Sequence, residues 1–286
     1  MPRRERGLER HGDQVLIRVG AAAADPADWH LMRGDPYLVR MILVLRKPRV
    51  LGGDMAGEVE SVGKNVTRSR PGDEVYAEVS TGGFAEYISF CEDRLALKPT
   101  NLTFEQAAAV PMAAMTALQG LRDAGRIEAG QKVLINGASG GIGTFAVQIA
   151  KSYGAEVTGV CSTRTVDRVR SIGADHVIDY TQEDFTRGQP RCDLILDTAW
   201  NRTLSEYRRA LTSKGAFVPV GGRGGRWLGP VPQILRAVLL SPFVGQRTAP
   251  VTMAPNKDDL RFLKELIEAG KVTPVIDRTY PLAEVP

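Results

Sequence analysis

The chain has 286 residues, of which 43% are hydrophobic and 24% are charged. These values are ordinary for a globular protein and the length is enough for two domains, so disorder is excluded as a starting assumption. The 37 basic residues stand among 33 acidic ones without a long basic run, which argues against nucleic-acid binding despite the net charge of +4. Three scattered cysteines and a start without an apolar leader predict a reduced, cytoplasmic protein.

Neither of the two most apolar stretches predicts a membrane span. Residues 133–150 are uncharged but interrupted by glycines, and residues 227–244 contain Arg236. The second stretch is interpreted as a buried helix and loop. A substrate entrance, a contact with a partner subunit and a contact with a membrane surface are its alternatives.

Short runs of alternating apolar and polar residues fill the chain up to Pro99, separated by Gly, Asp, Asn and Pro. This rhythm is typical of short antiparallel strands, and it predicts an all-β unit, a partly open barrel. The predicted strands cover residues 14–19, 56–62, 74–79 and 84–90.

The pattern changes at Thr103, which is expected to cap a helix that reaches about Arg122. From Gln131 onward, strands of buried type alternate with helical segments. This alternation predicts crossover units on a doubly wound parallel sheet, and hence an α/β fold class. The predicted strands are residues 132–136, 156–160, 177–178, 193–197 and 216–220, and the predicted helices are residues 141–153, 165–172 and 258–269.

The strongest motif is a glycine-rich turn between the strand at residues 132–136 and the helix that follows it. In this context Gly140 lets the backbone approach a pyrophosphate, and Gly143 lets the helix pack closely on the strand. The N–H groups of the first helical turn then face the anion. A glycine turn without a ligand is the alternative. The expected dinucleotide contacts are Ala138, Ser139, Gly140, Gly141, Ile142 and Gly143.

The end of the second strand of this sheet indicates which dinucleotide binds. An NAD site places Asp or Glu about 20 residues past the glycines, where the carboxylate binds the ribose hydroxyls. Here the strand is followed by Ser162, Thr163 and Arg164, which suit a 2′-phosphate. The nearest carboxylate along the chain, Asp167, falls within the next helix. The sequence therefore favours NADP(H), unless Ser162 and Thr163 only cap that helix.

From about Asp13 onward the sequence resembles the medium-chain dehydrogenase/reductase superfamily, in its quinone-oxidoreductase-like branch. The resemblance is carried by residues 50–66, with the run Gly-Gly-Asp-Met-Ala-Gly, by Pro-Gly-Asp-Glu-Val at residues 71–75, and by the glycine turn. It implies a GroES-like substrate domain followed by a Rossmann NADP-binding domain, with the cofactor between them. The expected domains are residues 1–102 with 271–286 returning toward them, and residues 103–270.

By the same resemblance, Thr116 lies beside the nicotinamide and Tyr180 lies near the adenosine phosphate. Two further strand ends are expected to line the cofactor cleft. The resemblance also implies a homodimer, formed through edge strands of the nucleotide-binding sheet. The residues at these two strand ends are Asp197, Thr198, Gly221 and Gly222.

A catalytic zinc is not expected. Zinc-dependent members of the family carry a His-Glu pair where this chain has Gly53 and Asp54. No cysteine stands at the first ligand position near Asp25, and Met112 falls where another ligand would stand. A zinc site needs three or four suitable ligands, and a four-cysteine structural lobe is absent as well.

Without a metal to form an alkoxide, reduction of a quinone or an α,β-unsaturated carbonyl is favoured, because the charge spreads over an enolate that a hydrogen-bond donor can stabilise. The segment from Asp25 to Tyr37 is the expected substrate wall. By resemblance, Asp25 replaces an asparagine and His30 stands where some quinone reductases have a tyrosine. His30 and Tyr37 are candidate proton donors, and a packed role in the core is the alternative for His30.

Two other functions stay open: reduction of an aldehyde or ketone to an alcohol, and NADPH binding without turnover by a sensor or structural protein. Family members usually have an extra β-hairpin before Val15 and a helix and closing strand after Pro286. The chain is therefore also expected to be truncated, with exposed strand edges that favour aggregation.

Overall fold

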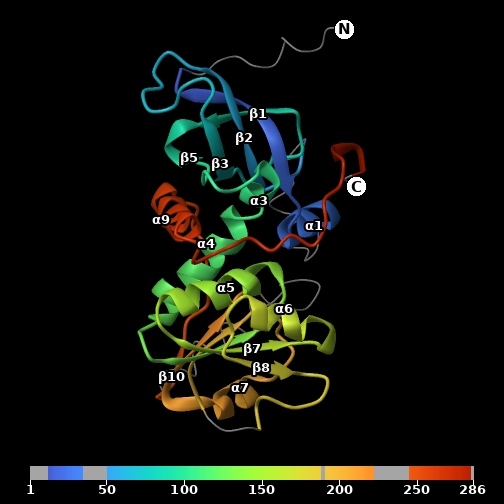
Figure 1. Cartoon of the computed structure of the whole chain (residues 1–286), viewed down its shortest axis with the longest axis vertical. Coiled ribbons are helices and arrows are strands. Elements are labelled where there is room, and N and C mark those ends of the chain that lie inside the picture. The colour runs from blue at the N-terminus through green and yellow to red at the C-terminus, as the bar shows by residue number, and fades with distance from the viewer. Residues whose placement is uncertain (1–11, 35–49, 188–190, 222–244, 285–286) are drawn as a thin grey trace.

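The computed structural model describes residues 12–34, 50–187, 191–221 and 245–284. It contains two sheets, which lie toward opposite ends of the long axis of the molecule, with helix α4 between them (Figure 1). This is the predicted α/β class, with an antiparallel unit first and a parallel sheet second. Tyr37, Gly222 and the apolar stretch at residues 227–244 lie outside the described residues.

The first sheet has five antiparallel strands in the order β4-β1-β2-β3-β5. One face of the sheet is buried, because alternate residues such as Val15, Ile17 and Met55 join a single apolar cluster. β1 runs to Ala23 rather than to the predicted Val19, since it stays paired with β2 across an irregularity in register. The strands are β1 (Gln14–Ala23), β2 (Asp54–Val62), β3 (Glu74–Glu78), β4 (Tyr87–Cys91) and β5 (Ala96–Leu97), with a 3-10 turn η1 (Glu92–Arg94).

A short helix after β1, α1 (Pro26–Arg33), is absent from the predicted elements. Asp25 caps it, because its Oδ1 accepts a hydrogen bond of 2.6 Å from the N–H of Ala27, and Asp28 bonds back to the N–H of Asp25. Gly34 ends the helix with a φ of 59°, a left-handed conformation that suits glycine. Both signals are present in the sequence, as Asp-Pro at the start and Gly at the end.

The single helix predicted for residues 103–122 is wrong, because the segment forms three elements. They are α3 (Phe104–Ala108), α4 (Pro111–Gln119) and a π-helical turn, η2 (Gly120–Gly125). Pro111 has no N–H to donate to the preceding turn, so a new helix begins there. The predicted cap is confirmed: the hydroxyl of Thr103 accepts a hydrogen bond from the N–H of Gln106.

The second sheet has six parallel strands in the order β11-β10-β9-β6-β7-β8. The order reverses beside β6, as in a doubly wound sheet, and the crossover helices lie where alternation predicts them. α7 is absent from the predicted elements, and β10 begins before the predicted residue 216. The strands are β6 (Lys132–Asn136), β7 (Glu156–Cys161), β8 (His176–Asp179), β9 (Cys192–Asp197), β10 (Leu211–Pro219) and β11 (Arg247–Thr248). The helices are α5 (Gly141–Ser152), α6 (Val166–Ser171) and α7 (Leu204–Ala210), with the 3-10 turns η3 (Thr163–Thr165) and η5 (Leu282–Glu284).

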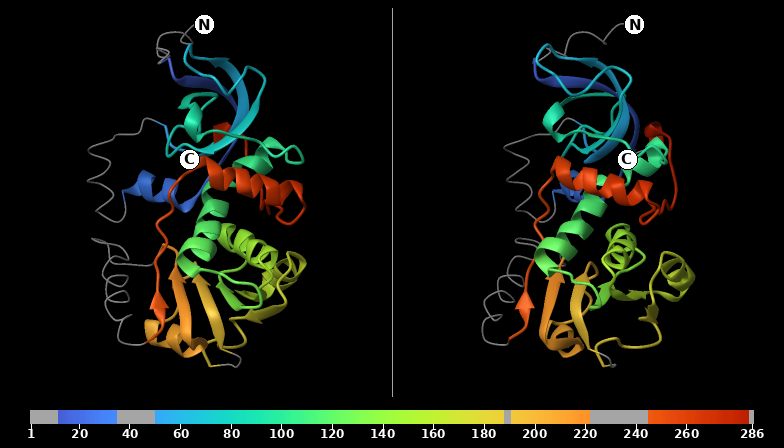
Figure 2. Two further views of the ribbon diagram at one scale, coloured as in Figure 1. Left: turned by 90° about the vertical axis from the view of Figure 1, so that its left-hand side faces the viewer. Right: turned by 60° about the vertical axis from the view of Figure 1, so that its left-hand side comes forward.

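Both faces of the parallel sheet are covered, which explains why its strands read as continuous apolar runs. Figure 2 shows α5 and α6 on one side of this sheet, where Ile135 and Phe145 belong to the largest apolar cluster. Leu134 and Tyr207 belong to a second cluster on the other face, to which α7 contributes. Within the described ranges, no helix is both long and apolar enough to cross a membrane.

The last long helix, α9 (Lys257–Glu268), matches its prediction to within one residue at each end. It joins the two halves of the chain, because the buried hydroxyl of Tyr76 on β3 donates a 2.6 Å hydrogen bond to the carbonyl oxygen of Leu260. At the other end of α9, Glu268 accepts hydrogen bonds from the N–H and hydroxyl of Thr100. The domain boundary at residue 102 stays a prediction.

Tyr76→Phe is expected to lower the free energy of unfolding by about 1 kcal/mol, because it removes a buried hydrogen bond between β3 and α9 but keeps the packed ring. Urea unfolding followed by circular dichroism measures the change. Tyr180→Phe is the control, since Tyr180 is 45% exposed. Equal effects of the two substitutions would contradict the proposed link between the halves.

Candidate nucleotide-binding site

The glycine turn joins β6 to α5 through a very close approach of backbone to backbone. A Cβ placed on Gly143 would lie 2.1 Å from the carbonyl oxygen of Gly137 and 2.8 Å from the Cα of Ala138. Gly137 itself has a φ of 87°, and a Cβ there would meet the Thr198 hydroxyl at 2.3 Å. Neither position admits a side chain, which agrees with the packing role predicted for Gly143.

The outer side of the same turn is open. Gly140 is the N-cap of α5 and makes no side-chain cap, and a Cβ on Gly141 would have no atom within 4 Å. Both residues are exposed, whereas Ala138 is buried and Ser139 and Ile142 are partly buried. The start of this 12-residue helix therefore has no side-chain cap, and its positive end favours an anion.

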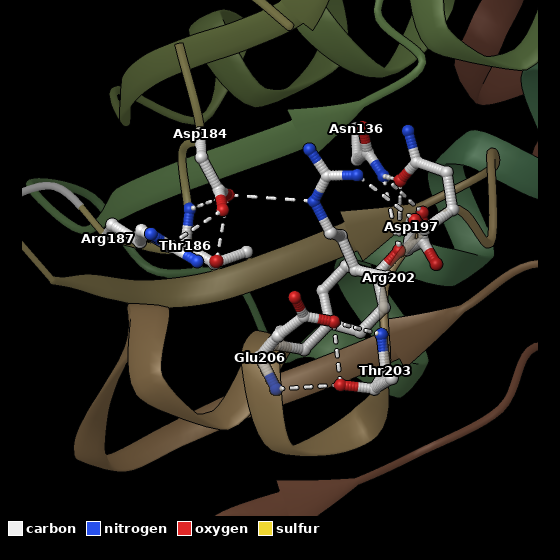
Figure 3. Close-up of polar contacts among 10 residues, drawn as sticks. Asn136, Asp184, Thr186, Arg187, Asp197, Arg202, Thr203 and Glu206 are labelled. Carbon is white, nitrogen blue, oxygen red and sulfur yellow. Dashed lines mark hydrogen bonds and ion pairs between the residues drawn. The ribbon is translucent and has the colours of Figure 1, made fainter.

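A buried polar network holds the strand ends beneath this turn (Figure 3). The side-chain amide nitrogen of Asn136, at the end of β6, lies within hydrogen-bond distance of three acceptors, Asp197 Oδ1 at 2.7 Å, Asn201 Oδ1 at 2.9 Å and the Tyr207 hydroxyl at 3.2 Å. Asp197 is fully buried, and burial raises its pKa. Its carboxylate thus braces β6 against β9. The next residue, Thr198, lies against Gly137 of the turn, and its hydroxyl donates to the Asn136 carbonyl oxygen.

The end of β7 carries the side chains predicted for the 2′-phosphate. Thr163 and Arg164 are exposed and Ser162 is partly buried. Ser162 makes no cap through its side chain, so the alternative of a simple helix cap is wrong for it. The hydroxyl of Thr163 donates instead to Asp179 Oδ2 at 2.6 Å. Asp179 is a carboxylate that the sequence interpretation missed, because it arrives from the neighbouring strand.

Tyr180 and Gly221 lie at further strand ends of the parallel sheet. Tyr180 follows β8, is 45% exposed, and its N–H donates to the carbonyl oxygen of Cys161. Gly221 follows β10 with a φ of 66°, and a Cβ there would have no atom within 4 Å. Both leave room at the carboxyl ends of the strands, where open α/β sheets bind their ligands.

The predicted substrate wall is the exposed side of α1. His30 is exposed, and its ring lies edge-on to that of Trp29, with 4.9 Å between centroids. The alternative of a packed core histidine is therefore wrong. Trp29 is 43% exposed and carries the guanidinium of Arg33 over its ring.

Behind α1, the residues that replace zinc ligands lie together. A Cβ on Gly53 would stand 3.2 Å from Asp25 Oδ2 and 3.4 Å from the methyl group of Met112. The Met112 N–H, in the first turn of α4, donates to Asp54 Oδ2 at 2.8 Å. One turn further on, the Thr116 hydroxyl donates to the Met112 carbonyl oxygen at 2.6 Å, which leaves its oxygen free to accept.

These residues do not fit a catalytic zinc. Gly53 offers no donor atom, and the Met112 side chain presents only a thioether. Across the described parts of the chain, no group of three or more His, Cys, Asp and Glu side chains is arranged to hold a metal ion. We therefore derive no step through a metal.

The same region contains several carboxyl groups, two of which have a buried oxygen without a hydrogen-bond partner among the described residues. Asp25 Oδ2 and Asp54 Oδ1 are buried, and neither forms a hydrogen bond with the part of the chain that the structure describes. Burial raises the pKa of Asp54 well above its usual value, and the nearby carboxyl groups of Asp25, Glu78 and Asp28 raise it further. Burial, followed by the charges of Asp28 and Glu78, raises the pKa of Asp25 as well. Of these four carboxyl groups, Glu78 forms an ion pair with a described residue, Arg94, at 2.6 Å.

Asp25→Asn is expected to raise the melting temperature at neutral pH by a few degrees, about the effect of 1 kcal/mol. A carboxyl group whose pKa is raised by folding destabilises the fold once it ionises. This cost is absent below about pH 4 and complete above the folded pKa. The advantage of the variant should therefore shrink as the pH is lowered toward 4.

Thermal unfolding between pH 4 and 8 checks this, with the exposed Asp277→Asn as the control for a lost charge. The amide keeps an oxygen to cap α1, so the helix is preserved. An Asp25→Asn variant less stable than the native chain at pH 7.5 would show that the charge is compensated.

Gly143→Ala and Gly141→Ala form a matched pair in the same turn. The first should lower the free energy of unfolding by about 1–3 kcal/mol or prevent folding, because its methyl group meets backbone atoms. The second should leave stability unchanged or raise it by up to about 1 kcal/mol, because alanine favours a helix. If a pyrophosphate binds there, Gly141→Ala should still weaken dinucleotide affinity.

Chemical denaturation and dinucleotide titration separate the two effects. Gly141→Ala with native affinity would place the ligand elsewhere. Gly143→Ala with native stability would mean that the backbone of the turn moves enough to accommodate the methyl group.

Known protein families match both parts of the chain. A family described as alcohol dehydrogenase GroES-like domain matches residues 11–100, and one described as zinc-binding dehydrogenase matches residues 172–286. A chloroplast envelope quinone oxidoreductase homolog of Arabidopsis thaliana is 31% identical over 285 residues, which cover 95% of this chain and 84% of the relative.

Two further relatives agree. A chloroplastic NADPH-dependent alkenal/one oxidoreductase of Arabidopsis thaliana is 35% identical over 285 residues, covering 94% of this chain and 66% of the relative. The structure of the quinone oxidoreductase from Coxiella burnetii superposes with a TM-score of 0.84 at 29% identity, covering 96% of this chain and 84% of that one. The chain belongs to the medium-chain dehydrogenase/reductase superfamily and groups with its quinone-oxidoreductase-like members.

Proposed function

We propose that the protein is an NADPH-dependent reductase that transfers hydride to a quinone or an α,β-unsaturated carbonyl without a metal. The open start of α5, which has no side-chain cap, carries the proposal, because it suits an anion and the close contact between Gly137 and Gly143 holds it against the end of β6. The names of the relatives, a quinone oxidoreductase homolog and an alkenal/one oxidoreductase, support the acceptor class.

The residues of the turn and of the neighbouring strand ends would hold the cofactor. First-turn amides at Gly141, Ile142 and Gly143 would bind the pyrophosphate, and the end of β7 the 2′-phosphate. Tyr180 would lie at the adenosine end. Thr116 would accept a hydrogen bond from the carboxamide, because its own hydroxyl proton is already donated to Met112. NADPH, when bound, supplies the hydride.

The acceptor would lie against α1. Hydride addition to a conjugated acceptor leaves an enolate, which needs a hydrogen-bond or proton donor. His30 on the exposed side of α1 and Tyr37 are our candidates for that donor. Asp25 would act indirectly, by fixing the start of α1 through its cap and by adding negative charge to the wall.

Two finer assignments belong to the same proposal. The three cysteines are unpaired, two of them buried, which suits a reducing compartment such as the cytoplasm. A homodimer through the edge strands of the parallel sheet would follow the family pattern. Size-exclusion chromatography with light scattering tests the dimer.

NADPH oxidation against a panel of quinones, enones, aldehydes and ketones tests the activity. Conjugated acceptors should exceed simple aldehydes in kcat/KM by about tenfold or more, since only they spread the charge. The Gly141→Ala variant should lose most of the rate while it stays folded.

Each other outcome of the panel identifies a different function. Preferred turnover of aldehydes would support an alcohol dehydrogenase-type reaction. NADPH binding without turnover would support a sensor or structural role. Turnover with NADH alone would refute the phosphate site.

A further inference from the structure

The end of β8 brings a carboxylate to the position at which the two dinucleotides differ. β7 and β8 are parallel neighbours, and Cys161 pairs with Asp179. The segment that leaves β7 contains Thr163, and the segment that leaves β8 begins at Tyr180. Asp179 thus lies beside the side chains proposed for the 2′-phosphate, although it is 16 residues from Thr163 in the chain.

Two threonines hold this carboxylate in place. Thr163 donates its hydroxyl to Asp179 Oδ2 at 2.6 Å. Thr181 donates its hydroxyl at 2.7 Å and its N–H at 2.9 Å to Asp179 Oδ1, and the two hydroxyl oxygens are 3.0 Å apart. The hydrogen bond from Thr163, with those from Thr181, lowers the pKa of Asp179, so the group is ionised at neutral pH.

The carboxylate keeps its full charge. None of the ion pairs among the described residues involves Asp179, and the group is only partly buried. Asp179 already accepts the hydrogen bond that the Thr163 hydroxyl would otherwise donate to a phosphate oxygen. A 2′-phosphate beside Asp179 would be repelled by its negative charge. It would also lack the hydrogen bond from Thr163, which Asp179 already accepts.

NAD sites use a carboxylate in this region to bind the ribose hydroxyls. In such sites the acid ends the second strand of the sheet. Here it ends the adjacent strand and reaches the same region through the β7–β8 pairing, while Arg164 and Ser162 still favour a phosphate. The site therefore combines features of both kinds.

We propose that Asp179 is a specificity-determining residue of this cofactor site, which limits the preference for NADPH and lets the enzyme also bind NADH. The inference rests on the proposed function, because it needs a dinucleotide at the glycine turn. Replacing the carboxylate by an amide should remove the repulsion. An amide at this position would also donate to Thr163, so that the threonine hydroxyl could turn toward the phosphate.

Titration calorimetry with NADPH and NADH on the native chain, Asp179→Asn and Asp179→Ser tests the proposal. Affinity for NADPH should rise by about tenfold in both variants, which corresponds to about 1.4 kcal/mol. Affinity for NADH should stay the same or fall by a few-fold, because a ribose acceptor is lost. Thermal melts confirm that each variant is folded.

Asp167→Asn is the matched control, since it removes the same charge near the end of β7. Its side chain is fully exposed and pairs only loosely with Arg170, at 3.6 Å. The control should leave the ratio of the two affinities within twofold of the native value, because a solvated charge is screened.

Three outcomes would overturn the proposal. The first is an unchanged ratio of affinities in both Asp179 variants. The second is an equal change in Asp167→Asn, which would reduce the effect to net charge. The third is weaker NADPH binding in the Asp179 variants, which would make the carboxylate a support of the phosphate site. If the native chain binds neither dinucleotide, the proposed function fails first and this inference falls with it.

Discussion

The backbone contact between Gly143 and the carbonyl oxygen of Gly137 is the constraint on which the rest of the nucleotide half depends. A Cβ at Gly143 would lie 2.1 Å from that oxygen, so the first turn of α5 lies directly against the end of β6. This approach fixes the direction of α5 and leaves its first amides without a side-chain cap. An uncapped helix start is costly unless water or a ligand satisfies it, so the same contact that shapes the fold also leaves amides that suit an anion.

The strand ends beneath the turn are stabilised by side chains. At the carboxyl edge of a parallel sheet, backbone N–H and C=O groups lose their partners in the neighbouring strands and need other hydrogen bonds. Asn136 and Asp197 supply them, and Thr198 links the bracing to the turn through the Asn136 carbonyl oxygen. The network is satisfied only in part, because Asp197 Oδ2 is buried without a hydrogen-bond partner among the described residues. Asp197 thus supports the strand ends, and Thr198 connects them to the turn.

In the N-terminal half, the carboxyl groups of Asp25 and Asp54 hold the first turns of α1 and α4. Asp25 caps α1 with one oxygen and turns the other toward Gly53 and Met112, where zinc-dependent relatives would hold their ion. Asp54 accepts from the first turn of α4, the helix that carries Thr116. Burial raises the pKa of both carboxyl groups, so α1 and α4 begin at groups that are costly to ionise.

The sequence by itself determined the class of fold, the glycine turn and most strands, because a short apolar run that is bounded by glycine is too short for a buried helix and favours a buried strand. The strand at Lys132–Asn136 is an example. It failed where a single residue outweighed the pattern, as when Pro111 divided the expected helix. Only the tertiary structure decided that Asp179 meets Thr163 and that Asp25 meets Gly53. Local preferences act over a few residues, whereas strand order, which sets these neighbours, depends on packing of the whole chain.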